Sequence, residues 1–336
     1  MSLLPAEKEK RQVYVLREAK TDDKFGHYPD SRPIDTLLKY GVINLDKPSG
    51  PTSHQVSFFV SQILGVKKAG HSGTLDPKVT GVLPIILNKA TGMANLMLKS
   101  GKEYVTLMHL HCDVDDRSLT KVCSEFVGTI TQMPPVKSAV KRRYRKRTVY
   151  YLEILDRKGR DVLIKTGVQA GTYIRKLVHD IGQKLGCGAH MVELRRTKSG
   201  PFTEYEKDHL VTLQDLKDAV YYYKEEGNER FLRYCIQPFE KTAEFVPKVY
   251  VLDSAIDPIA HGSPLNLPGI SKIESGIKKG SVVAVVSLKG ELVAYGTAEM
   301  STQEMLSNKR GLAIKIDRVF IEPGIYPKYV KNPSNS

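Results

Sequence analysis

The apolar positions of this chain follow two periods, one typical of strands and one typical of helices. Short apolar runs predict strands at 42–45, 82–87, 104–111, 148–155 and 162–168. Three other stretches repeat apolar residues every three or four positions and predict helices. One begins at Thr52 or Ser53 and ends at Gly65, one ends at Gly186, and one begins after Thr212. Because strands and helices interleave without a strict strand–helix–strand rhythm, we expect an α+β fold.

The pattern changes near residue 246, after which short β-rich runs dominate. Lys-Gly turns separate three of these runs, at 281–287, 291–295 and 312–320. Short strands with regular turns are typical of a small barrel. Residues 1–36 are instead polar and have no sustained period, so we expect an arm that lies on the surface or is partly disordered. These changes divide the chain into an N-terminal arm at 1–36, a larger domain at 37–245 and a small domain at 248–330.

The 336 residues include 51 lysines and arginines against 37 aspartates and glutamates, for a formal net charge of +14. Such an excess favours a polyanionic partner, nucleic acid or an anionic membrane surface, although a basic protein need not have one. No stretch approaches the roughly 20 apolar residues that cross a bilayer, and residues 1–11 lack the apolar core of a secretory signal. We therefore expect no membrane association and a protein that stays where it is made.

The densest cluster of positive charge is the segment 137–147, KSAVKRRYRKR, which holds seven cations, one tyrosine and no acid. Lysine and arginine neutralise phosphates, and an aromatic ring stacks on a base. Because this segment runs into a predicted strand, we interpret it as a loop that grips RNA phosphates rather than as a targeting signal. The cations assigned to RNA binding are Lys141, Arg142, Arg143, Arg145 and Arg147.

The four cysteines, Cys112, Cys123, Cys187 and Cys235, do not show the CxxC spacing that binds zinc. A chain of this length does not need disulfides to hold its core together. We therefore expect four buried, reduced thiols and no structural metal.

One glycine-containing loop displays a carboxylate. In Gly70-His-Ser-Gly-Thr-Leu-Asp-Pro-Lys-Val-Thr-Gly-Val-Leu-Pro84, Pro77 keeps Asp76 out of helical geometry, and the glycines on either side permit a tight backbone. Taken alone, Asp76 could also belong to an ordinary Asp-Pro turn or a helix cap. Taken alone, His71 could be an ordinary loop histidine whose hydrogen bonds are made within the protein.

A second segment offers this carboxylate a partner. Arg175 and Lys176 fall in the first turn of a predicted helix, where the helix dipole disfavours cations, so we expect an acid or a phosphate nearby. A buried arginine would hold a carboxylate ionised and oriented, while the alternative is a solvated arginine. Tyr104 lies at the start of a strand, where it could also be a half-buried strand aromatic. Residues 190–200 are basic and could track phosphates.

Together these segments resemble, in order, the motifs of the TruB branch of RNA pseudouridine synthases. GHSGTLDPKVTGVLP resembles the active-site loop of that branch. Similar to its other motifs are Leu45–His54, Lys102–Val105, Gly171–Arg175 and Leu194–Thr197. The resemblance covers residues 36–240, and residues 248–325 resemble a PUA domain. It implies a pseudouridine synthase fold, with a mixed, mainly antiparallel central sheet flanked by helices, followed by a small β-barrel-like PUA domain.

Carried over residue by residue, the resemblance implies that Asp76 is the catalytic aspartate and that Arg175 pairs with it. The other residues that bind or support the substrate would be Tyr104 against the target base, His71 at the flipped-out nucleotide, Leu194 in the pocket wall and Lys47 beneath the loop. The resemblance implies neither a metal nor an organic cofactor.

Within that branch the chain is most similar to the archaeal and eukaryotic dyskerin-like enzymes, through Pro134–Arg143, Arg147–Tyr150, the arm and the PUA-like end. This resemblance implies the catalytic subunit of an H/ACA guide-RNA particle acting on rRNA and/or tRNA, with a guide RNA and small H/ACA proteins as partners. Without the lysine-rich tail of nuclear dyskerins, we expect an archaeal, cytoplasmic protein; a eukaryotic one would be nucleolar. Two alternatives stay open: a stand-alone tRNA pseudouridine-55 synthase and a non-catalytic RNA-binding assembly scaffold.

Overall fold

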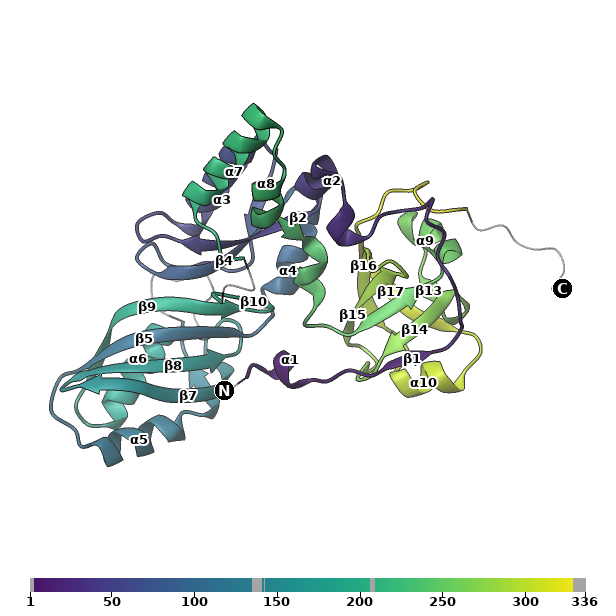
Figure 1. The fold of residues 1–336 in the computed structure, drawn as a ribbon. Helices are drawn as coiled ribbons and strands as arrows, with labels where there is room; N and C mark the ends of the chain where they lie inside the picture. The colour runs from purple at the N-terminus through teal and green to yellow at the C-terminus, as the bar shows by residue number, and fades with distance from the viewer. Residues whose placement is uncertain (1–2, 135–140, 142, 206–208, 329–336) are drawn as a thin grey trace. The chain divides into compact units, whose positions relative to one another are not determined.

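The computed structural model describes residues 3–134, 141, 143–205 and 209–328. The chain has the expected α+β fold, and its residues group into two compact units (Figure 1). Unit 1 contains residues 1–8, 43–86 and 93–236. Unit 2 contains residues 9–42, 87–92 and 237–336. Residues 1–36 are therefore divided between the two units.

The larger sheet, most of which belongs to unit 1, has ten strands among the described residues. Eight follow the order β11-β2-β4-β9-β5-β8-β7-β6, while β3 pairs with β4 and β10 pairs with β9. β4 and β9 run parallel, whereas the series from β9 to β6 is antiparallel. The expected mixed, mainly antiparallel sheet is confirmed. Its strands are β2 (Gly41–Lys47), β3 (Ala69–His71), β4 (Thr80–Leu87), β5 (Lys102–Leu110), β6 (Gly128–Gln132), β7 (Arg145–Lys158), β8 (Asp161–Val168), β9 (Ala189–Ser199), β10 (Phe202–Thr203) and β11 (Gln237–Pro238).

The three helices predicted from apolar spacing are confirmed as α3 (Ser53–Leu64), α6 (Ile174–Lys184) and α7 (Leu213–Glu226). Thr52 and Thr212 start α3 and α7 with capping boxes, and Gly65 ends α3 with a φ of 66°. The apolar sides of α6 and of α5 (Asp116–Glu125) pack with β5, β7, β8 and β9 in one buried cluster. The remaining helices of unit 1 are α1 (Pro5–Lys8), α4 (Ala94–Met97) and α8 (Arg230–Cys235).

Unit 2 contains a sheet of seven strands among the described residues, in the order β1-β14-β12-β15-β16-β17-β13. β12 and β15 run parallel, and the other pairs are antiparallel. Its core joins these strands to two helices. The elements are β1 (Val13–Val15), α2 (Ile34–Lys39), β12 (Lys248–Val251), α9 (Asp253–Ala260), β13 (Leu265–Asn266), β14 (Ile270–Glu274), β15 (Val282–Ser287), β16 (Leu292–Ala298), α10 (Thr302–Ser307) and β17 (Leu312–Val319), with 3-10 turns at Pro29–Ser31, Asn88–Met93, Phe239–Ala243 and Leu267–Gly269.

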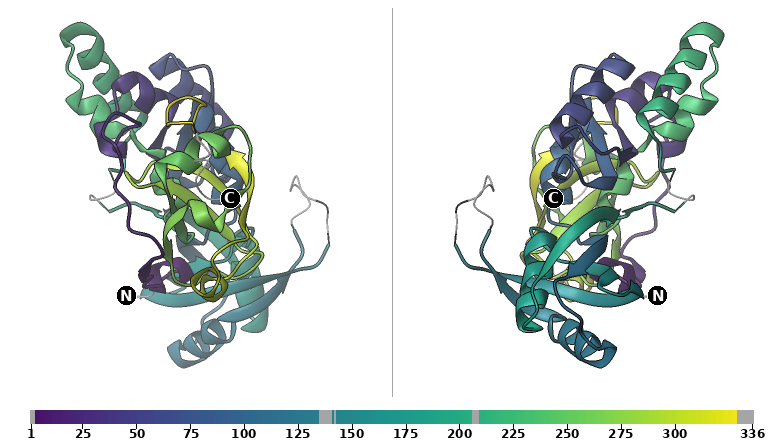
Figure 2. Two further views of the ribbon diagram at one scale, coloured as in Figure 1. Left: turned by 90° about the vertical axis from the view of Figure 1, so that its right-hand side faces the viewer. Right: turned by 90° about the vertical axis from the view of Figure 1, so that its left-hand side faces the viewer.

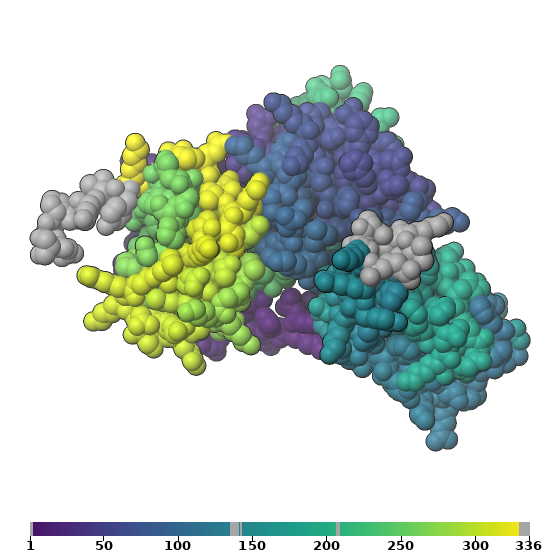
Figure 3. Space-filling model, turned by 180° about the vertical axis from the view of Figure 1, so that it is seen from behind, coloured from purple at the N-terminus to yellow at the C-terminus, as the bar shows by residue number. Residues whose placement is uncertain are grey.

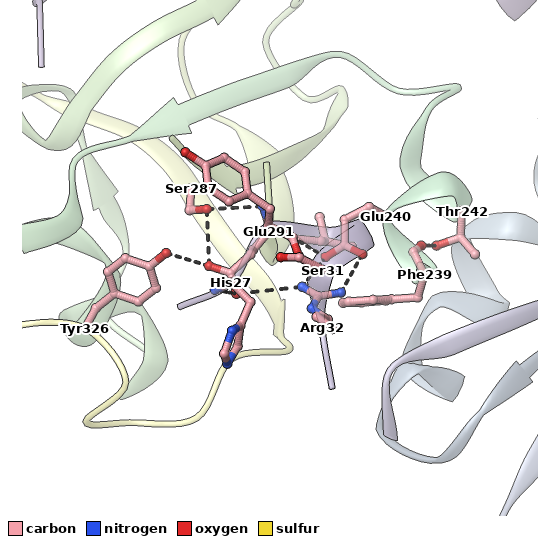
Figure 4. A network of polar contacts seen from close by, with 11 residues as sticks. His27, Ser31, Arg32, Phe239, Glu240, Thr242, Ser287, Glu291 and Tyr326 are labelled. Carbon is pink, nitrogen blue, oxygen red and sulfur yellow. Dashed lines mark hydrogen bonds and ion pairs between the residues drawn. The ribbon is translucent and has the colours of Figure 1, made fainter. Parts of the chain in front are cut away.

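A buried ionic network fixes residues 9–42 within unit 2 (Figure 4). The Arg32 side chain, with the residue only 5% exposed, donates from Nη1 and Nη2 to the two carboxylate oxygens of Glu240 at 2.8 and 2.7 Å. Its Nη2 also lies 3.8 Å from Glu291 Oε1, and the Tyr326 hydroxyl donates to Glu291 Oε2 at 2.5 Å. Since β1 also pairs with β14, this part of the arm is built into the fold rather than only lying on its surface.

The cysteines correct one expectation. Cys112 and Cys187 form a disulfide, with Cα atoms 5.5 Å apart, although 75 positions separate them in sequence. The prediction of four reduced thiols was wrong for this pair, because the two cysteines become neighbours only when β5 and β9 pair. Cys123 and Cys235 are free and buried, and burial raises the pKa of their thiols to about 11 and about 12.

Candidate active site

Asp76 lies in the loop between β3 and β4, on a backbone that Lys47 holds from the core side. The Lys47 side chain is buried, and its Nζ donates hydrogen bonds to the carbonyl oxygens of Pro77 and Val79, both at 2.9 Å. Burial and the nearby charge of Arg196 lower the pKa of Lys47, while the charge of Asp76 raises it. Lys47 therefore shapes the turn on which the carboxylate stands.

The two flanks of the loop are also fixed. The backbone N–H of Leu75 donates to Ser53 Oγ at 2.8 Å, and that hydroxyl donates to the Leu75 carbonyl at 3.1 Å. On the other flank, Gly81 has a φ of 100°, and a Cβ placed there would lie 2.2 Å from the Arg196 carbonyl oxygen. Only glycine lets the loop approach β9 so closely. Leu75 is buried, so the turn presents Asp76 outward.

Arg175, the second residue of α6, contacts this carboxylate directly. Its Nη2 donates to Asp76 Oδ2 at 2.7 Å. The acid expected near the first turn of this helix is therefore Asp76 itself, whereas Lys176 pairs with Asp180. The pair is not buried as expected, since the two side chains are 61% and 59% exposed. Water screens such a pair and leaves it worth at most about 1 kcal/mol to folding, so its main effect is to orient the carboxylate.

Tyr104, on β5, is half-buried and joined to the loop through Arg196. Arg196 is fully buried, donates from Nε to the Val82 carbonyl at 2.7 Å and from Nη2 to the Gly73 carbonyl at 3.2 Å, and also hydrogen-bonds Tyr104. Burial lowers the pKa of Arg196, and Tyr104 raises it. One buried guanidinium thus links the backbone around Asp76 to the Tyr104 side chain.

The segment 190–200, whose basic residues could track phosphates, is largely β9. Two of its cations are not available to phosphates, because Arg196 and Lys198, near the C-terminal end of β9, are 1% and 5% exposed. The neighbouring Arg195 pairs with Asp46 and Glu204. The sequence does not reveal this role because basic residues normally lie at the surface, and their acceptors here come from distant parts of the chain.

Lys102, at the start of β5, is a further buried cation near the site. The sequence places it in the motif Lys102–Val105 but predicts no separate role for it. Its Nζ donates to the carbonyl oxygens of Met97 at 2.9 Å and of Ser100 at 2.8 Å. Burial, followed by the charge of Arg196, lowers the pKa of Lys102 to about 7. Lys102 therefore attaches the end of α4 and the turn that follows it to the start of β5, the strand that carries Tyr104.

His71 and Leu194 lie on two strands of the same sheet. His71 is half-buried in β3, and its Nδ1 is a buried atom without a hydrogen-bond partner among the described residues. Burial, and then the charges of Arg196 and His54, lower the pKa of His71, which favours a neutral imidazole. Leu194 is half-buried on β9 and, like Tyr104, packs against the apolar cluster of α5 and α6.

The basic segment links β6 to β7, whose adjoining ends extend away from the rest of the unit (Figure 2). The start of β7 lies at the surface (Figure 3). Lys141 and Arg143 are exposed, Arg145 and Arg147 are half-buried in β7, and Arg142 lies outside the described residues. Among the residues that are described, no hydrogen bond or ion pair joins this segment to Asp76 or Tyr104.

Neither a metal cluster nor a membrane-spanning helix occurs in the described ranges. Within them, no group of three or more histidine, cysteine or acidic side chains is arranged to hold a metal ion. No helix there is both long enough and apolar enough to cross a bilayer.

Comparison with known families matches four consecutive parts of the chain. The TruB family pseudouridylate synthase (N-terminal domain) matches residues 61–174, and the tRNA pseudouridylate synthase B C-terminal domain matches residues 175–244. A PUA domain matches residues 247–320, and a DKCLD (NUC011) domain matches residues 2–57. Asp76 and Tyr104 lie in the first match, and Arg175 begins the second.

Individual relatives are similar over almost the whole chain. A probable tRNA pseudouridine synthase B of Nanoarchaeum equitans is 56% identical over 325 residues, 97% of this chain and 92% of that protein. The protein of the same name from Pyrococcus abyssi is 54% identical over 326 residues, 97% of each.

Two solved structures are similar at the level of the fold. A chain in an H/ACA RNP bound to a substrate RNA containing 2'-deoxyuridine has a TM-score of 0.92 and 51% identity, covering 98% of this chain and all of that one. A chain of a Cbf5-Nop10-Gar1 complex has a TM-score of 0.93 and 53% identity, covering 97% of this chain and 99% of that one.

Proposed function

The chain belongs to the TruB family of pseudouridylate synthases, and from this premise we propose that Asp76 is the carboxylate with which it converts uridine to pseudouridine in RNA. The observation that carries the proposal is the position of Asp76, exposed on a fixed loop and 2.7 Å from the Arg175 guanidinium. Its exposure leaves the carboxylate open to an incoming nucleotide. The guanidinium favours the ionised form and fixes its direction.

The reaction is an isomerisation that an ionised carboxylate can serve. The bond between uracil N1 and ribose C1′ breaks, a bond between C5 and C1′ forms, C5 loses a proton and N1 gains one, so no atom is added or removed. Asp76 can attack the sugar, attack the base, or remove a proton during the rearrangement, and each of these routes needs the same ionised group. The target uridine must first leave the stack, at a cost of a few kcal/mol.

The residues around Asp76 fit the handling of a flipped-out base. We assign the Tyr104 ring to stacking on that base, a contact worth about 1–3 kcal/mol. Arg196 holds Tyr104 against the loop, and Leu194 supplies the apolar wall. The lowered pKa of His71 suits a neutral imidazole that hydrogen-bonds the displaced nucleotide or its phosphate.

The cations of the basic segment supply RNA affinity without serving the chemistry. Lys141 and Arg143 are exposed beside Tyr144, which is 72% exposed, so phosphate contacts and base stacking are available at one place. We assign Arg142, Arg145 and Arg147 to the same surface. The part of the chain that matches a PUA domain, residues 247–320, is assigned as a second RNA-binding region.

We further propose that the protein is the catalytic subunit of an H/ACA guide-RNA particle, with the guide RNA and small H/ACA proteins as partners. The support is the likeness, over 97–98% of the chain, to a chain of an H/ACA RNP and to a chain of a Cbf5-Nop10-Gar1 complex. The guide would then choose the target uridine in rRNA or tRNA. The relatives are archaeal, and we place the reaction in an archaeal cytoplasm.

A second function is favoured by the names of the curated relatives, which are called probable tRNA pseudouridine synthases B. The protein would then modify position 55 of the tRNA T-arm by itself. Incubating unmodified tRNA with the protein alone, and a guide-matched rRNA fragment with the protein, guide RNA and partner proteins, separates the two roles. Turnover of tRNA without guide supports the stand-alone role, and turnover only in the complete mixture supports the guided role.

Replacing Asp76 by asparagine tests the proposed chemistry. Asp76→Asn keeps the size of the side chain and removes its charge, so pseudouridine formation should stop while RNA affinity stays within about threefold, a change of less than 1 kcal/mol. A variant that still turns over would refute the role of Asp76. A wild-type protein that binds RNA without ever modifying it would instead favour the assembly scaffold.

A further inference from the structure

The first described residues of the chain are docked on the sheet of unit 1. We call residues 3–8 the N-terminal hook. Leu4 is 3% exposed, and a Cβ placed at Gly101 would lie 3.3 Å from Leu4 Cδ2, so Leu4 packs directly against the start of β5. The Leu4 backbone N–H donates to Glu7 Oε2 at 2.6 Å, which closes the hook on itself. Chain ends usually fray unless something ties them down, and Leu4 supplies such an anchor.

The hook contributes Glu7 to a row of three charged side chains, Glu7, Lys198 and Glu103. Glu7 Oε1 accepts a hydrogen bond from Lys198 Nζ at 2.9 Å, and the same Nζ lies 3.9 Å from Glu103 Oε2. Lys198 on β9 and Glu103 on β5 are direct cross-strand neighbours, 5% and 2% exposed. One buried cation is therefore shared between a carboxylate of the sheet and a carboxylate of the hook.

Glu103 accepts two further hydrogen bonds, one from β9 and one from β7. Its Oε1 accepts from Thr197 Oγ1 at 2.8 Å, and its Oε2 accepts from the Tyr151 hydroxyl at 2.5 Å. Tyr151 reaches it across β8 at Gly167, where a Cβ would lie 2.2 Å from the tyrosine ring. Glu103 is thus the point at which β5, β7, β9 and the hook meet, and the next residue along β5 is Tyr104.

From this arrangement we propose that the N-terminal hook is a positioning element of the active site, in which Glu7 acts through Lys198 and Glu103 to fix the strand that carries Tyr104. The proposal rests on the proposed function, because it takes Tyr104 as the residue that stacks on the target base. Lys198 and Glu103 are buried and Glu7 is exposed, so this row adds little net stability, since desolvation and solvent screening offset the attraction. It does fix the register and direction of the strands that it joins.

The test uses the full-length protein with Glu7→Gln, which keeps the length of the side chain and removes its charge. The matched control is Lys8→Gln, a substitution at the exposed neighbour of Glu7. Glu7→Gln should lower kcat by about tenfold and leave KM within about twofold. A misplacement of 1 Å at an active site can lower the rate by about 100-fold, so a tenfold loss corresponds to a smaller displacement of Tyr104. Lys8→Gln should leave both unchanged. In a Lys198→Met background, Glu7→Gln should have no further effect, because the two changes break one chain of contacts.

Amide hydrogen exchange over residues 102–106, measured without RNA, separates this proposal from the proposed function. Glu7→Gln should speed exchange there and Lys8→Gln should not. If the wild type shows no turnover, the proposed function fails, and faster exchange in Glu7→Gln alone still supports the hook. If the wild type is active and Glu7→Gln changes neither kcat nor exchange, or only lowers the melting temperature, the hook is not a positioning element.

Discussion

The Asp76–Arg175 pair is open to solvent, whereas the cations beneath it, Lys47, Lys102 and Arg196, are buried. The exposed pair and the buried cations have different roles. An exposed pair adds at most about 1 kcal/mol to folding, so its value lies in directing a charged carboxylate toward the substrate. The buried cations lose hydration, and hydrogen bonds to backbone carbonyls offset that loss. The loop of Asp76 keeps its shape because its Pro77 and Val79 carbonyls have a fixed donor in Lys47, and its Gly73 carbonyl has one in Arg196.

Lys102 predicts a pH dependence of stability. Its pKa is about 7 in the folded protein against 10.5 for an ordinary lysine, so between these values the unfolded chain holds one more proton than the folded chain. The free energy of unfolding should therefore rise with pH in this window, by up to about 1.4 kcal/mol per pH unit. Below pH 7 both states are protonated, and the dependence disappears.

Denaturant unfolding of the wild type and of Lys102→Met from pH 6 to 10 measures this slope as a difference, in which other titrating groups cancel. Lys99→Met, a change at an exposed position close by, is the control and should follow the wild type. Parallel curves for Lys102→Met and the wild type would contradict the lowered pKa of Lys102.

Among individual residues, the sequence predicts the display of Asp76 better than it predicts the positions of the cations around it. The Asp-Pro turn indicates a displayed Asp76, and the unfavourable position of Arg175 in a first helical turn indicates a nearby acid. The burial of Arg196 and Lys102 could not be predicted, because a basic residue is normally exposed. Each is buried here where backbone carbonyl groups from other elements accept its hydrogen bonds, Val82 of β4 for Arg196 and Met97 of α4 for Lys102.

At the scale of elements, β9 connects most parts of the site. Its residues meet the loop of Asp76, the strand of Tyr104 and the hook, through Arg196, Lys198 and Leu194. The sequence does not mark it as a strand, since its alternating positions hold charged residues on both faces. The helices α3, α6 and α7 were predictable because each has one apolar side and clear capping residues.

The hairpin end between β6 and β7 predicts a salt dependence of RNA binding. Replacing Arg143 and Arg145 by glutamine should weaken binding and flatten the log–log dependence of affinity on salt by about 0.7–0.9 for each phosphate that is no longer neutralised. Lys158→Gln, at the far end of β7 and exposed, should leave the slope unchanged. Affinities measured at several salt concentrations check this, and an unchanged slope for the double variant would remove the segment from the interface.

The disulfide predicts a redox dependence of unfolding. It closes a loop of 75 positions that contains α5, β7, β8 and α6, and closing such a loop stabilises the folded state by about 4 kcal/mol in the chain-entropy account. Reductant should therefore lower the free energy of unfolding of the wild type by an amount of this order. The double variant Cys112→Ser, Cys187→Ser should be insensitive to reductant, and equal stability of the wild type with and without reductant would contradict the disulfide.

At the scale of the whole molecule, the sequence predicts two regions with different patterns of apolar residues, and the structure has two compact units. What the sequence cannot supply is the division of residues 1–36, because their partners lie far along the chain. Leu4 and Glu7 dock on the sheet of unit 1, while Arg32 pairs with Glu240 in unit 2. Neither contact leaves a periodic signal, since each depends on a few side chains rather than on a repeating face.

Position-resolved pseudouridine mapping tests most directly whether Asp76 is the residue with which the protein forms pseudouridine in RNA. Unmodified tRNA and guide-matched rRNA fragments are incubated with wild type or Asp76→Asn at concentrations that give equal RNA occupancy, with and without guide RNA and partner proteins. Defined pseudouridines should appear with the wild type in at least one mixture and in none with Asp76→Asn. Equal modification by both proteins, or none by the wild type in any of the mixtures, would contradict this role of Asp76.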